Sequence, residues 1–255
     1  MGALDHRHVL ITGAGTGIGA AIARALAGEG AAVSLAGRRK APLDNVAESL
    51  GNATAIVADV TKEADCVAMA SAARKAHGPI DIVVANAGAA ASAPAAKTDL
   101  SRWQSMIDVN LTGAFLTVKA ALADVTRSSE GARRIIFIAS TAGLKGYPYV
   151  AAYCAAKHGV VGLARALSLE LQPTGVTVNA VCPGYTDTPL LDAAAEKISA
   201  TTGRSAEDSR AMLARDNPSG RLVKPEEVAA AVLRLCLPAS ALVNGQAIEV
   251  TGGPQ

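Results

Sequence analysis

The chain has few charged residues and even fewer aromatic ones. Of its 255 residues, 18% are charged and 3% are aromatic, with a single tryptophan. The charged share is below the roughly 25% typical of soluble domains, but 50% of the residues are hydrophobic. A chain of this length and composition can bury a full core, which excludes a disordered protein.

Long runs of one charge sign are absent, as are long runs of apolar residues. The formal net charge is +2 without a basic block, which argues against nucleic acid or an anionic membrane as a partner. We find no stretch of about 18 apolar residues that is free of charge. The N-terminus lacks the apolar stretch and cleavage site of a secretory signal. We expect a cytoplasmic protein, with no membrane partner, that acts on small molecules.

Cysteine is scarce and its spacing excludes a metal cluster. The four cysteines form no CxxC pair and have no histidine at metal-ligand spacing, so we expect free, mostly buried thiols in a reducing compartment and no metal site. They are Cys66, Cys154, Cys182 and Cys236. We interpret His158 as structural, and we expect no clustering of His6, His8 and His77.

Short β-branched runs alternate with Ala-rich amphipathic stretches along the whole chain. The apolar runs include "HVLITG", "AAVSLAG", "IDIVVANAG", "RRIIFIAS" and "GVTVNAVCPG". Apolar strands separated by helices indicate a parallel sheet covered on both faces. We predict the α/β class: residues 1–255 form a single Rossmann-like domain, a doubly wound parallel sheet of about seven strands with helices on both faces. Residues 186–222 read as an irregular substrate-loop insertion.

A glycine-rich segment, "TGAGTGIG", follows the first predicted strand. Its glycines allow a tight turn and close backbone approach to a pyrophosphate, while the next helix offers unpaired N–H groups. A flexible turn is the alternative, but the position between strand and helix favours nucleotide binding. The glycines in question are Gly13, Gly17 and Gly19.

Two further strand ends suit a nucleotide. Asp59 and Val60 follow the third predicted strand, where a carboxylate can accept from an adenine amino group and a valine can cover the ring. A helix-capping role for Asp59 is an equal alternative. Asn86, Ala87 and Gly88 follow the fourth strand and read either as a close approach to a ligand or as a plain turn.

The segment "YCAAK" places a phenol and an ammonium one helical turn apart. Side chains at i and i+4 share a helix face, so Tyr153 and Lys157 can act on a common point. Such a pair is usually an ordinary helix face, and its interpretation depends on the rest of the chain. The other motifs are "VNLTG" at 109–113, "IAS" at 138–140 and "CPG" at 182–184.

Along its whole length, the chain resembles the short-chain dehydrogenase/reductase family. "TGAGTGIG", "NAG", "VNLTG", "IAS", "YCAAK" and "CPG" stand in that family's order and approximate spacing. The resemblance is strongest to bacterial ketoreductases that act on 3-oxoacyl thioesters or polyketide-like ketones. It implies an oxidoreductase that transfers a hydride between a nicotinamide cofactor and a ketone or secondary alcohol.

The resemblance implies a catalytic tetrad of Asn110, Ser140, Tyr153 and Lys157. Ser140 would bind the substrate carbonyl, Tyr153 would donate its proton, and Asn110 would anchor a water relay. Lowering the phenol pKa from about 10 to about 7 takes about 4 kcal/mol. A nearby ammonium can supply one to three pKa units, so we expect Lys157 to lower the pKa of Tyr153 and also to hold the nicotinamide ribose. On the residues alone, Asn110 reads as a helix-kinking polar residue.

The resemblance also implies cofactor contacts around the strand ends. Arg38 and Arg39 follow Gly37, where a ribose-binding carboxylate would stand, so NADP(H) is favoured, with NAD(H) possible because Thr16 replaces a second basic residue. Thr188 would bind the nicotinamide carboxamide, or it caps the next helix. The implied set is Gly13, Thr16, Gly17, Ile18, Gly19, Arg38, Arg39, Asp59, Val60, Asn86, Ala87, Gly88, Tyr153, Lys157, Pro183, Gly184 and Thr188.

Substrate identity and assembly are less defined by the sequence. We expect the substrate pocket near residues 141–149 and after Pro189, lined by Tyr147, Tyr149, Tyr185, Leu190 and Leu191, the last two being equally suited to the core. Helix formers at 151–171 are apolar around much of the circumference, and in the resembled family this helix pairs across a two-fold interface, which predicts a homotetramer. The alternatives are an NAD-dependent alcohol dehydrogenase of the same fold and a non-catalytic nucleotide-sensing protein.

Overall fold

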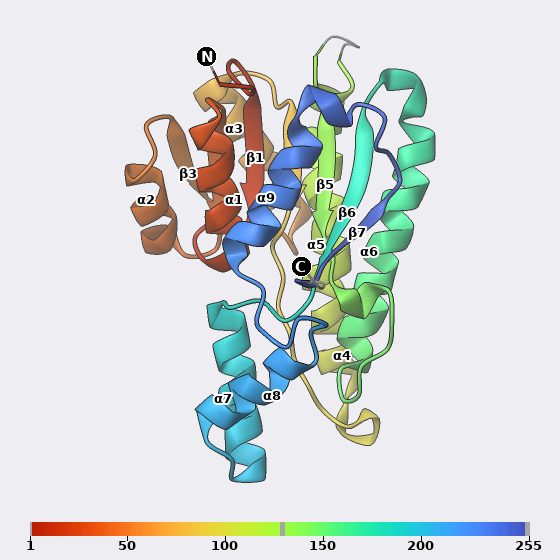
Figure 1. Cartoon of the computed structure of the whole chain (residues 1–255). Coiled ribbons are helices and arrows are strands. Elements are labelled where there is room, and N and C mark those ends of the chain that lie inside the picture. The colour runs from red at the N-terminus through yellow and green to blue at the C-terminus, as the bar shows by residue number, and fades with distance from the viewer. Residues whose placement is uncertain (1, 128–130, 253–255) are drawn as a thin grey trace.

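The computed structural model describes residues 2–127 and 131–252, and its centre is a parallel β-sheet. Every paired strand runs parallel to its neighbours, in the order β3-β2-β1-β4-β5-β6-β7. The prediction of a seven-stranded, doubly wound sheet is therefore confirmed (Figure 1). The strands are β1 (His8–Thr12), β2 (Ala32–Gly37), β3 (Ala53–Val57), β4 (Ile82–Ala85), β5 (Arg134–Ile138), β6 (Thr177–Pro183) and β7 (Ala247–Val250).

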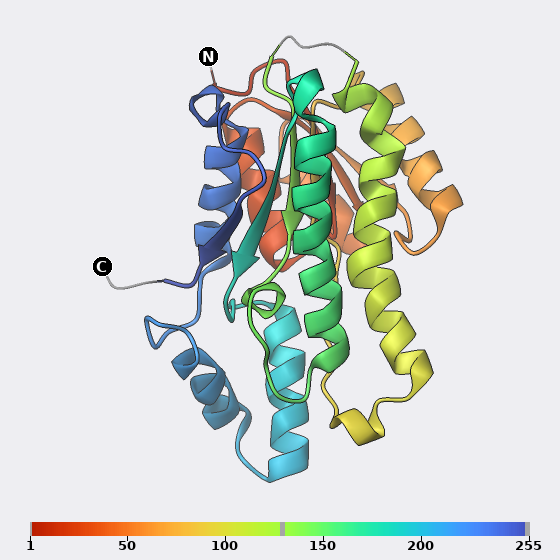
Figure 2. The same ribbon diagram turned by 90° about the vertical axis from the view of Figure 1, so that its right-hand side faces the viewer.

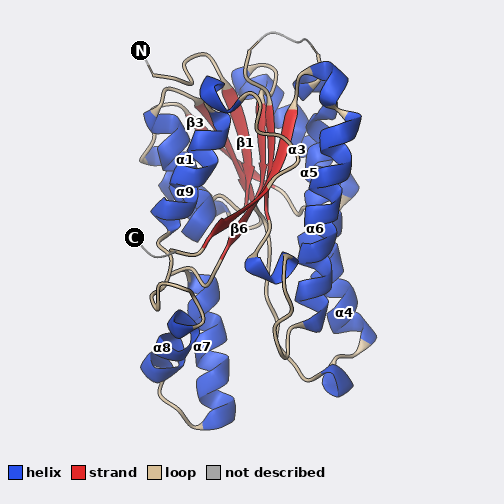
Figure 3. Cartoon of the chain, turned by 45° about the vertical axis from the view of Figure 1, so that its right-hand side comes forward, coloured by secondary structure: helices blue, strands red, loops and turns tan. Residues whose placement is uncertain are grey.

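Helices cover both faces of the sheet, with one hydrophobic core on each side (Figure 3). One face carries α1 (Gly17–Gly28), α2 (Lys40–Glu48) and α9 (Pro225–Cys236), and the other carries α3 (Glu63–His77), α5 (Gly113–Val125) and α6 (Ala151–Glu170). Successive residues of β1 enter opposite cores, Leu10 one and Val9 and Ile11 the other. Because both faces of the sheet are covered, the strands are largely apolar and do not alternate between apolar and polar residues.

The helix α4 (Leu100–Ile107) continues into α5 through a π-helical turn, Asp108–Thr112. The combined helix, Leu100–Val125, has the length and mean hydropathy of a membrane span. It is nevertheless a core helix of this domain, because its Leu116, Val118 and Ala121 are buried against the sheet. Helices of this kind in globular proteins meet the same criteria of length and composition.

The segment 186–222 is helical, which corrects the prediction of an irregular insertion. It holds α7 (Pro189–Thr202) and α8 (Ala206–Arg215), which project beyond the carboxyl ends of the strands (Figures 1 and 2). The two helices share a small cluster of Leu191, Ala195 and Leu213, which explains why Leu191 is buried while Leu190 is 45% exposed. Short 3₁₀ turns lie at Ala95–Lys97, Thr141–Gly143, Gln172–Thr174 and Pro238–Ser240.

Candidate active site

The glycine-rich turn lies at the carboxyl end of β1 and opens helix α1. Gly13 and Gly17 have φ values of +66° and +53°, which favour glycine. A Cβ atom on Gly19 would lie 2.3 Å from the Gly13 carbonyl oxygen, so the turn can close only with glycine there. Thr16, the N-cap of α1, makes no side-chain capping bond, and the first turn of α1 has no acidic residue. This open, cationic helix end fits a dinucleotide phosphate.

The ends of β2 and β3 bring a basic and an acidic group together. Arg38 and Arg39 are exposed and make no hydrogen bond or ion pair with another described residue. Lys40 instead begins α2 and binds Asp44 at 2.6 Å. Asp59 accepts hydrogen bonds from the backbone and hydroxyl of Thr61, which together with the charge of Arg38 lower the pKa of its carboxyl group. Arg38 and Arg39 are thus two cations at this edge whose guanidinium groups are not engaged in a hydrogen bond or ion pair with a described residue.

Val60 and Asn86 both have structural contacts at their strand ends. Val60 is buried against Gly113, where an added Cβ atom would lie 2.7 Å from Val60 Cγ2. The side-chain amide of Asn86 donates to the carbonyls of Thr12 and Gly13 at 2.8 and 3.2 Å. The backbone N–H groups of Asn86 and Ala87 donate to the Thr12 hydroxyl. Asn86 therefore ties the end of β4 to the glycine-rich turn and helps to hold its shape.

Asn110 lies in the π-helical turn and is 1% exposed. Its Nδ2 donates to the carbonyls of Ala89 and Met106, and its Oδ1 accepts from the Ala89 N–H. A Cβ atom on Gly88 would lie 2.9 Å from Asn110 Oδ1 and 3.7 Å from Lys157 Nζ. Gly88 thus lies beside both polar groups, and π-helical turns of this kind are frequent at functional sites.

Lys157 is buried on the face of α6 that meets the sheet. Its side chain is surrounded by protein, and its ammonium donates to the Ile138 carbonyl oxygen at 2.8 Å. Burial lowers the pKa of this group from 10.5 to about 8, against a smaller opposing influence of Cys182. The ammonium is therefore easier to deprotonate than an ordinary lysine.

Tyr153 shares the face of α6 with Lys157, with the ammonium 5.7 Å from the centre of its ring. Burial raises the pKa of the phenol above its ordinary value of 10.0, and the nearby Ser140 hydroxyl lowers it by a smaller amount. This is opposite to the expectation that Lys157 lowers the pKa of Tyr153. The physical reason is desolvation, which disfavours a phenolate more than these neighbours favour it.

Ser140 follows β5 and caps the turn Thr141–Gly143, where its hydroxyl accepts from the Ala142 N–H at 3.1 Å. The neighbouring Thr141 hydroxyl shares a hydrogen bond of 2.9 Å with the Tyr147 hydroxyl. Beside them, the Tyr147 and Tyr185 rings meet edge to face, with centroids 6.0 Å apart. Tyr149 is 66% exposed, so of the three predicted pocket tyrosines it lies furthest out towards solvent.

Thr188 is the N-cap of α7, accepting from the Leu191 N–H. A Cβ atom on Gly17 would lie 3.1 Å from Thr188 Cγ2, so α7 starts directly beside the glycine-rich turn. Pro183 ends β6, and the Gly184 N–H donates to the Val250 carbonyl. The structure thus brings together the strand-end motifs, the face of α6 and the start of α7.

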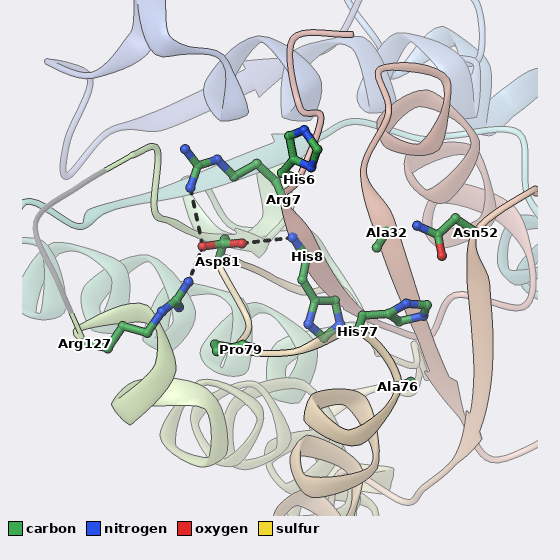
Figure 4. A pocket seen from close by; sticks show the side chains of 10 residues that line it. All are labelled: His6, Arg7, His8, Ala32, Asn52, Ala76, His77, Pro79, Asp81 and Arg127. Atoms are coloured by element: carbon green, nitrogen blue, oxygen red, sulfur yellow. Dashed lines mark hydrogen bonds and ion pairs between the residues drawn. The ribbon is translucent and has the colours of Figure 1, made fainter. Parts of the chain in front are cut away.

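The histidines of the amino edge cluster, which shows that the expectation of no clustering is wrong. His6, His8 and His77 line one cavity of about 490 Å³ at the opposite edge of the sheet (Figure 4). The His8 and His77 ring centroids are 5.2 Å apart. The sequence hides this arrangement because the start of β1, His8, and the end of α3, His77, are 69 residues apart in the chain and meet only in the fold.

The hydrogen bonds of His8 define its tautomer. Its Nδ1 lies 2.8 Å from the Gly78 carbonyl, which only accepts, so Nδ1 carries the proton. Its Nε2 accepts from the Ser34 hydroxyl at 2.9 Å. Burial lowers the pKa of both His8 and His77, so His8 is a neutral structural residue remote from the strand-end site.

The comparisons with known proteins agree with this architecture. The family model described as short chain dehydrogenase matches residues 7–199. The chain belongs to the short-chain dehydrogenase family. It is therefore an NAD(P)-dependent oxidoreductase that acts on CH–OH and C=O groups, and the chain as a whole resembles polyketide and 3-oxoacyl ketoreductases.

Three relatives show how far the similarity extends. The cis-4-hydroxycyclohexanecarboxylate dehydrogenase of Sinomonas cyclohexanicum is 39% identical over 256 residues, covering 98% of this chain and 97% of that protein. A variant of actinorhodin polyketide ketoreductase, crystallised with NADPH, superposes with a TM-score of 0.91 at 38% identity, covering 96% of each chain. The 3-ketoacyl-(acyl-carrier-protein) reductase of Brucella melitensis, complexed with NADH, has a TM-score of 0.88 at 32% identity, covering 98% of each.

One buried residue beside the candidate site of this short-chain dehydrogenase was not predicted from the sequence. Asn217 is 4% exposed and binds the backbone of Tyr185, next to the end of β6. Its sequence context, "DNPSG", is a typical turn signature, so nothing in the sequence separates a buried asparagine from an exposed one.

Proposed function

We propose that this enzyme reduces ketones with NADPH, using Tyr153 as the proton donor. Asn110, Ser140, Tyr153 and Lys157 form the proposed tetrad. The observation that carries the proposal is the position of the Tyr153 phenol, next to the Ser140 hydroxyl and one helical turn from Lys157. A group that must give up a proton is best kept protonated until the substrate oxygen develops charge.

Each residue has a distinct proposed role. The bound nicotinamide supplies the hydride, or accepts it in the reverse direction. The Ser140 hydroxyl orients the carbonyl oxygen, and Tyr153 donates its proton to that oxygen. Lys157 holds the nicotinamide ribose, and its charge stabilises the phenolate that forms on Tyr153. Asn110 keeps the Ala89 backbone in place, and beside Lys157 it can hold the water through which the proton is replaced.

The preference for NADP(H) rests on the turn after β2. Gly37 offers no carboxylate to the ribose, and the exposed Arg38 has no partner among the described residues. A guanidinium without a partner suits a 2′-phosphate, with which it makes charge-assisted hydrogen bonds. Arg39 stands next to it as the N-cap of α2. NAD(H) remains the alternative cofactor, since Thr16 adds no positive charge in the glycine-rich turn.

A 3-oxoacyl thioester or a related ketone is the proposed substrate class. Its support is the similarity to ketoreductases of polyketide and 3-ketoacyl substrates. Beside the turn Thr141–Gly143, the Tyr147 and Tyr185 rings pack edge to face and the Tyr147 hydroxyl binds Thr141, and in this proposal both rings line the substrate pocket. Leu190, at the start of α7, is exposed enough to contact a substrate.

We also propose a cytoplasmic homotetramer. Of the four free cysteines, all but Cys154 are buried, as expected in a reducing compartment. Helix α6 lies beside α5 (Figure 2), and its exposed positions include Ala155, Gly162 and Ala166 among a few polar residues. The two helices also carry Leu169 at 73% and Phe115 at 43% exposure. A second copy would cover this apolar face.

The test is a panel of ketones and secondary alcohols, including an acetoacetyl thioester, assayed with NADPH and NADH. The proposal expects hydride transfer to ketones with a higher kcat/KM for NADPH. A clear preference for NADH would favour the NAD-dependent alternative. Nucleotide binding without turnover of any ketone or alcohol would favour the sensing protein and contradict the proposal.

A further inference from the structure

Tyr185 occupies a fixed position at the wall of the candidate active site. It follows Pro183 and Gly184, and its ring meets Tyr147 edge to face at 6.0 Å. Tyr147 in turn is hydrogen-bonded through its hydroxyl to Thr141, the neighbour of Ser140. Tyr185 is thus linked by two contacts to Thr141, the neighbour of the residue proposed to hold the substrate carbonyl.

A buried asparagine holds the backbone of Tyr185 at both of its polar groups. Asn217 Oδ1 accepts from the Tyr185 N–H, and Asn217 Nδ2 donates to the Tyr185 carbonyl, both at 2.9 Å. Nδ2 also donates to the Arg221 carbonyl at 2.7 Å. A Cβ atom on Gly184 would lie 2.3 Å from Asn217 Oδ1, so the glycine is needed for this approach.

The same arrangement recurs on the other side of the site. Asn110 binds both backbone groups of Ala89 in the way that Asn217 binds those of Tyr185. In each case a carboxamide pairs with the backbone as a neighbouring strand would, just where the chain leaves the sheet. The Val223 N–H adds a further hydrogen bond to the Tyr185 carbonyl. Tyr185 is therefore held as firmly as a strand residue, although it lies in a loop.

The phenolic hydroxyl of Tyr185 is available to a ligand. It makes no hydrogen bond with another described residue. The hydroxyl is also not one of the fully buried polar atoms without a hydrogen-bond partner. It is therefore accessible to solvent. Burial, with the nearby Asp216, Tyr147 and Tyr153, raises the pKa of the phenol to about 12. Near neutral pH the group is therefore a protonated hydrogen-bond donor, and it lies close enough to Tyr153 for the two phenols to influence each other electrostatically.

We propose that Tyr185 is a second hydrogen-bond donor of the substrate pocket, fixed in place by Asn217. Ser140 and Tyr153 take the reacting carbonyl, and Tyr185 takes another acceptor oxygen of the same molecule. The site then selects ketones that carry a second carbonyl or ester oxygen near the reacting one. This inference rests on the proposed ketone reduction and narrows its substrate class.

The test compares two ketones of equal chain length in the wild type and in Tyr185→Phe. Ethyl acetoacetate carries ester oxygens beyond its ketone, and methyl pentyl ketone does not. A neutral hydrogen bond is worth about 0.5–1.5 kcal/mol, so Tyr185→Phe should lower the ratio of the two kcat/KM values, ester over plain ketone, by about two- to tenfold. The loss should appear mainly in KM, since the proton donor is retained.

Two controls separate this role from general packing. Tyr147→Phe removes a hydroxyl that already binds Thr141, so it should change the ratio by less than about twofold. Asn217→Ala should lower the ratio in the same direction as Tyr185→Phe. In the double variant the ratio should fall no further than in Tyr185→Phe alone, because Asn217 acts through Tyr185.

The outcomes also distinguish this inference from the proposed function. If Tyr185→Phe lowers both kcat/KM values by the same factor, Tyr185 is packing only and the inference is wrong, while ketone reduction stands. An effect of Asn217→Ala that adds fully to that of Tyr185→Phe would overturn the positioning role. Wild-type protein that reduces neither ketone with NADPH or NADH contradicts the proposed function itself.

Discussion

Lys157 and Tyr153 share one face of α6, but the lysine ammonium is directed to the sheet and not to the phenol oxygen. It donates to the Ile138 carbonyl at 2.8 Å and lies 5.7 Å from the centre of the Tyr153 ring. Lys157 is buried and Tyr153 is half-buried, and desolvation raises the pKa of the phenol and lowers that of the ammonium. The pair is therefore poised for proton donation, and the phenolate gains its stabilisation only as the reaction proceeds.

The buried ammonium should make the wild-type enzyme less stable than a variant without it. The pKa of Lys157 falls from 10.5 unfolded to about 8 folded, so the folded state holds its proton less tightly. Stability gained from the neutral amine is present above the unfolded pKa and lost as pH falls towards about 8. At neutral pH, Lys157→Met should raise the free energy of unfolding by about 1–3 kcal/mol. Urea unfolding measures this, and a destabilised variant would contradict the burial argument.

The same Lys157→Met variant should bind the cofactor more weakly. In the proposed mechanism one ammonium holds the nicotinamide ribose and stabilises the Tyr153 phenolate, so both the NADPH dissociation constant and kcat should worsen. Fluorescence titration with NADPH measures the dissociation constant, and steady-state kinetics measure kcat. An unchanged dissociation constant would remove the ribose role and leave only the role in proton transfer.

The cofactor preference should depend on two adjacent residues after β2. Arg38→Ala should weaken the binding of NADPH by about tenfold or more, because charge-assisted hydrogen bonds to the 2′-phosphate are worth about 1.5–3 kcal/mol. The affinity for NADH, which has no 2′-phosphate, should change little. Adding Gly37→Asp should reverse the preference, since a carboxylate accepts from the ribose and repels a phosphate.

The structure accommodates this double change. A Cβ atom at Gly37 would come no closer than 3.6 Å to Leu43, an ordinary contact. Arg24→Ala, on α1, serves as a matched loss of a positive charge. If Arg38→Ala raises the Michaelis constants for NADPH and NADH by the same factor, the basic turn does not bind the 2′-phosphate and is only a solvent-exposed turn.

Stability at mildly acidic pH should depend on the amino-edge cavity. Burial depresses the pKa of His8 below 6.5, so its contribution to stability is present above that value and lost as pH falls through the folded pKa. Asp81 opposes this effect and His77 adds to it. In His8→Gln, the free energy of unfolding should decrease less between about pH 7 and about pH 5 than it does in the wild type. This slope can be compared even if the variant is less stable at neutral pH. His158→Gln, on the exposed face of α6, should keep the wild-type slope, and an equal slope in all three proteins would contradict the assignment.

The proposed assembly should depend on the exposed face of α6. Leu169→Glu places a charge at a site that is 73% exposed in the single chain and buried in the proposed tetramer. Light scattering at micromolar concentration should show a tetramer for the wild type and smaller species for this variant. Leu242→Glu, at a 98% exposed position outside that face, should remain tetrameric. A wild-type mass of 25.6 kDa would show that the chain is a monomer.

The parts of the fold that follow from periodicity and local motifs could be predicted from the sequence. The apolar strands and the glycine-rich turn are signals within a few neighbouring residues, and the seven-stranded sheet follows from them. The helices α7 and α8 were missed although signals exist: Thr188 precedes Pro189, and Ser205 caps α8 three residues before Asp208. A cap residue marks where a helix can begin but not that one follows, so Thr188 was compatible with either a cofactor contact or a helix start.

Other features have no local signal. The histidine cavity forms because distant segments meet at one edge of the sheet. The direction of the Tyr153 pKa shift depends first on desolvation, which follows from the packing around the side chain and not from the motif. The role of Asn217 depends on the path of the chain between α8 and α9. Such properties arise from tertiary packing and need the structure.

The central claim, that Tyr153 donates the proton in ketone reduction, is tested most directly by Tyr153→Phe. This variant keeps the ring and loses the transferable proton. Single-turnover oxidation of enzyme-bound NADPH by ethyl acetoacetate should slow by about two orders of magnitude or more, the usual contribution of a positioned acid. The NADPH dissociation constant, measured on the same samples, should stay within about threefold of wild type, a change below about 0.7 kcal/mol. Wild-type-like turnover with intact NADPH binding would show that another group supplies the proton and would contradict the account.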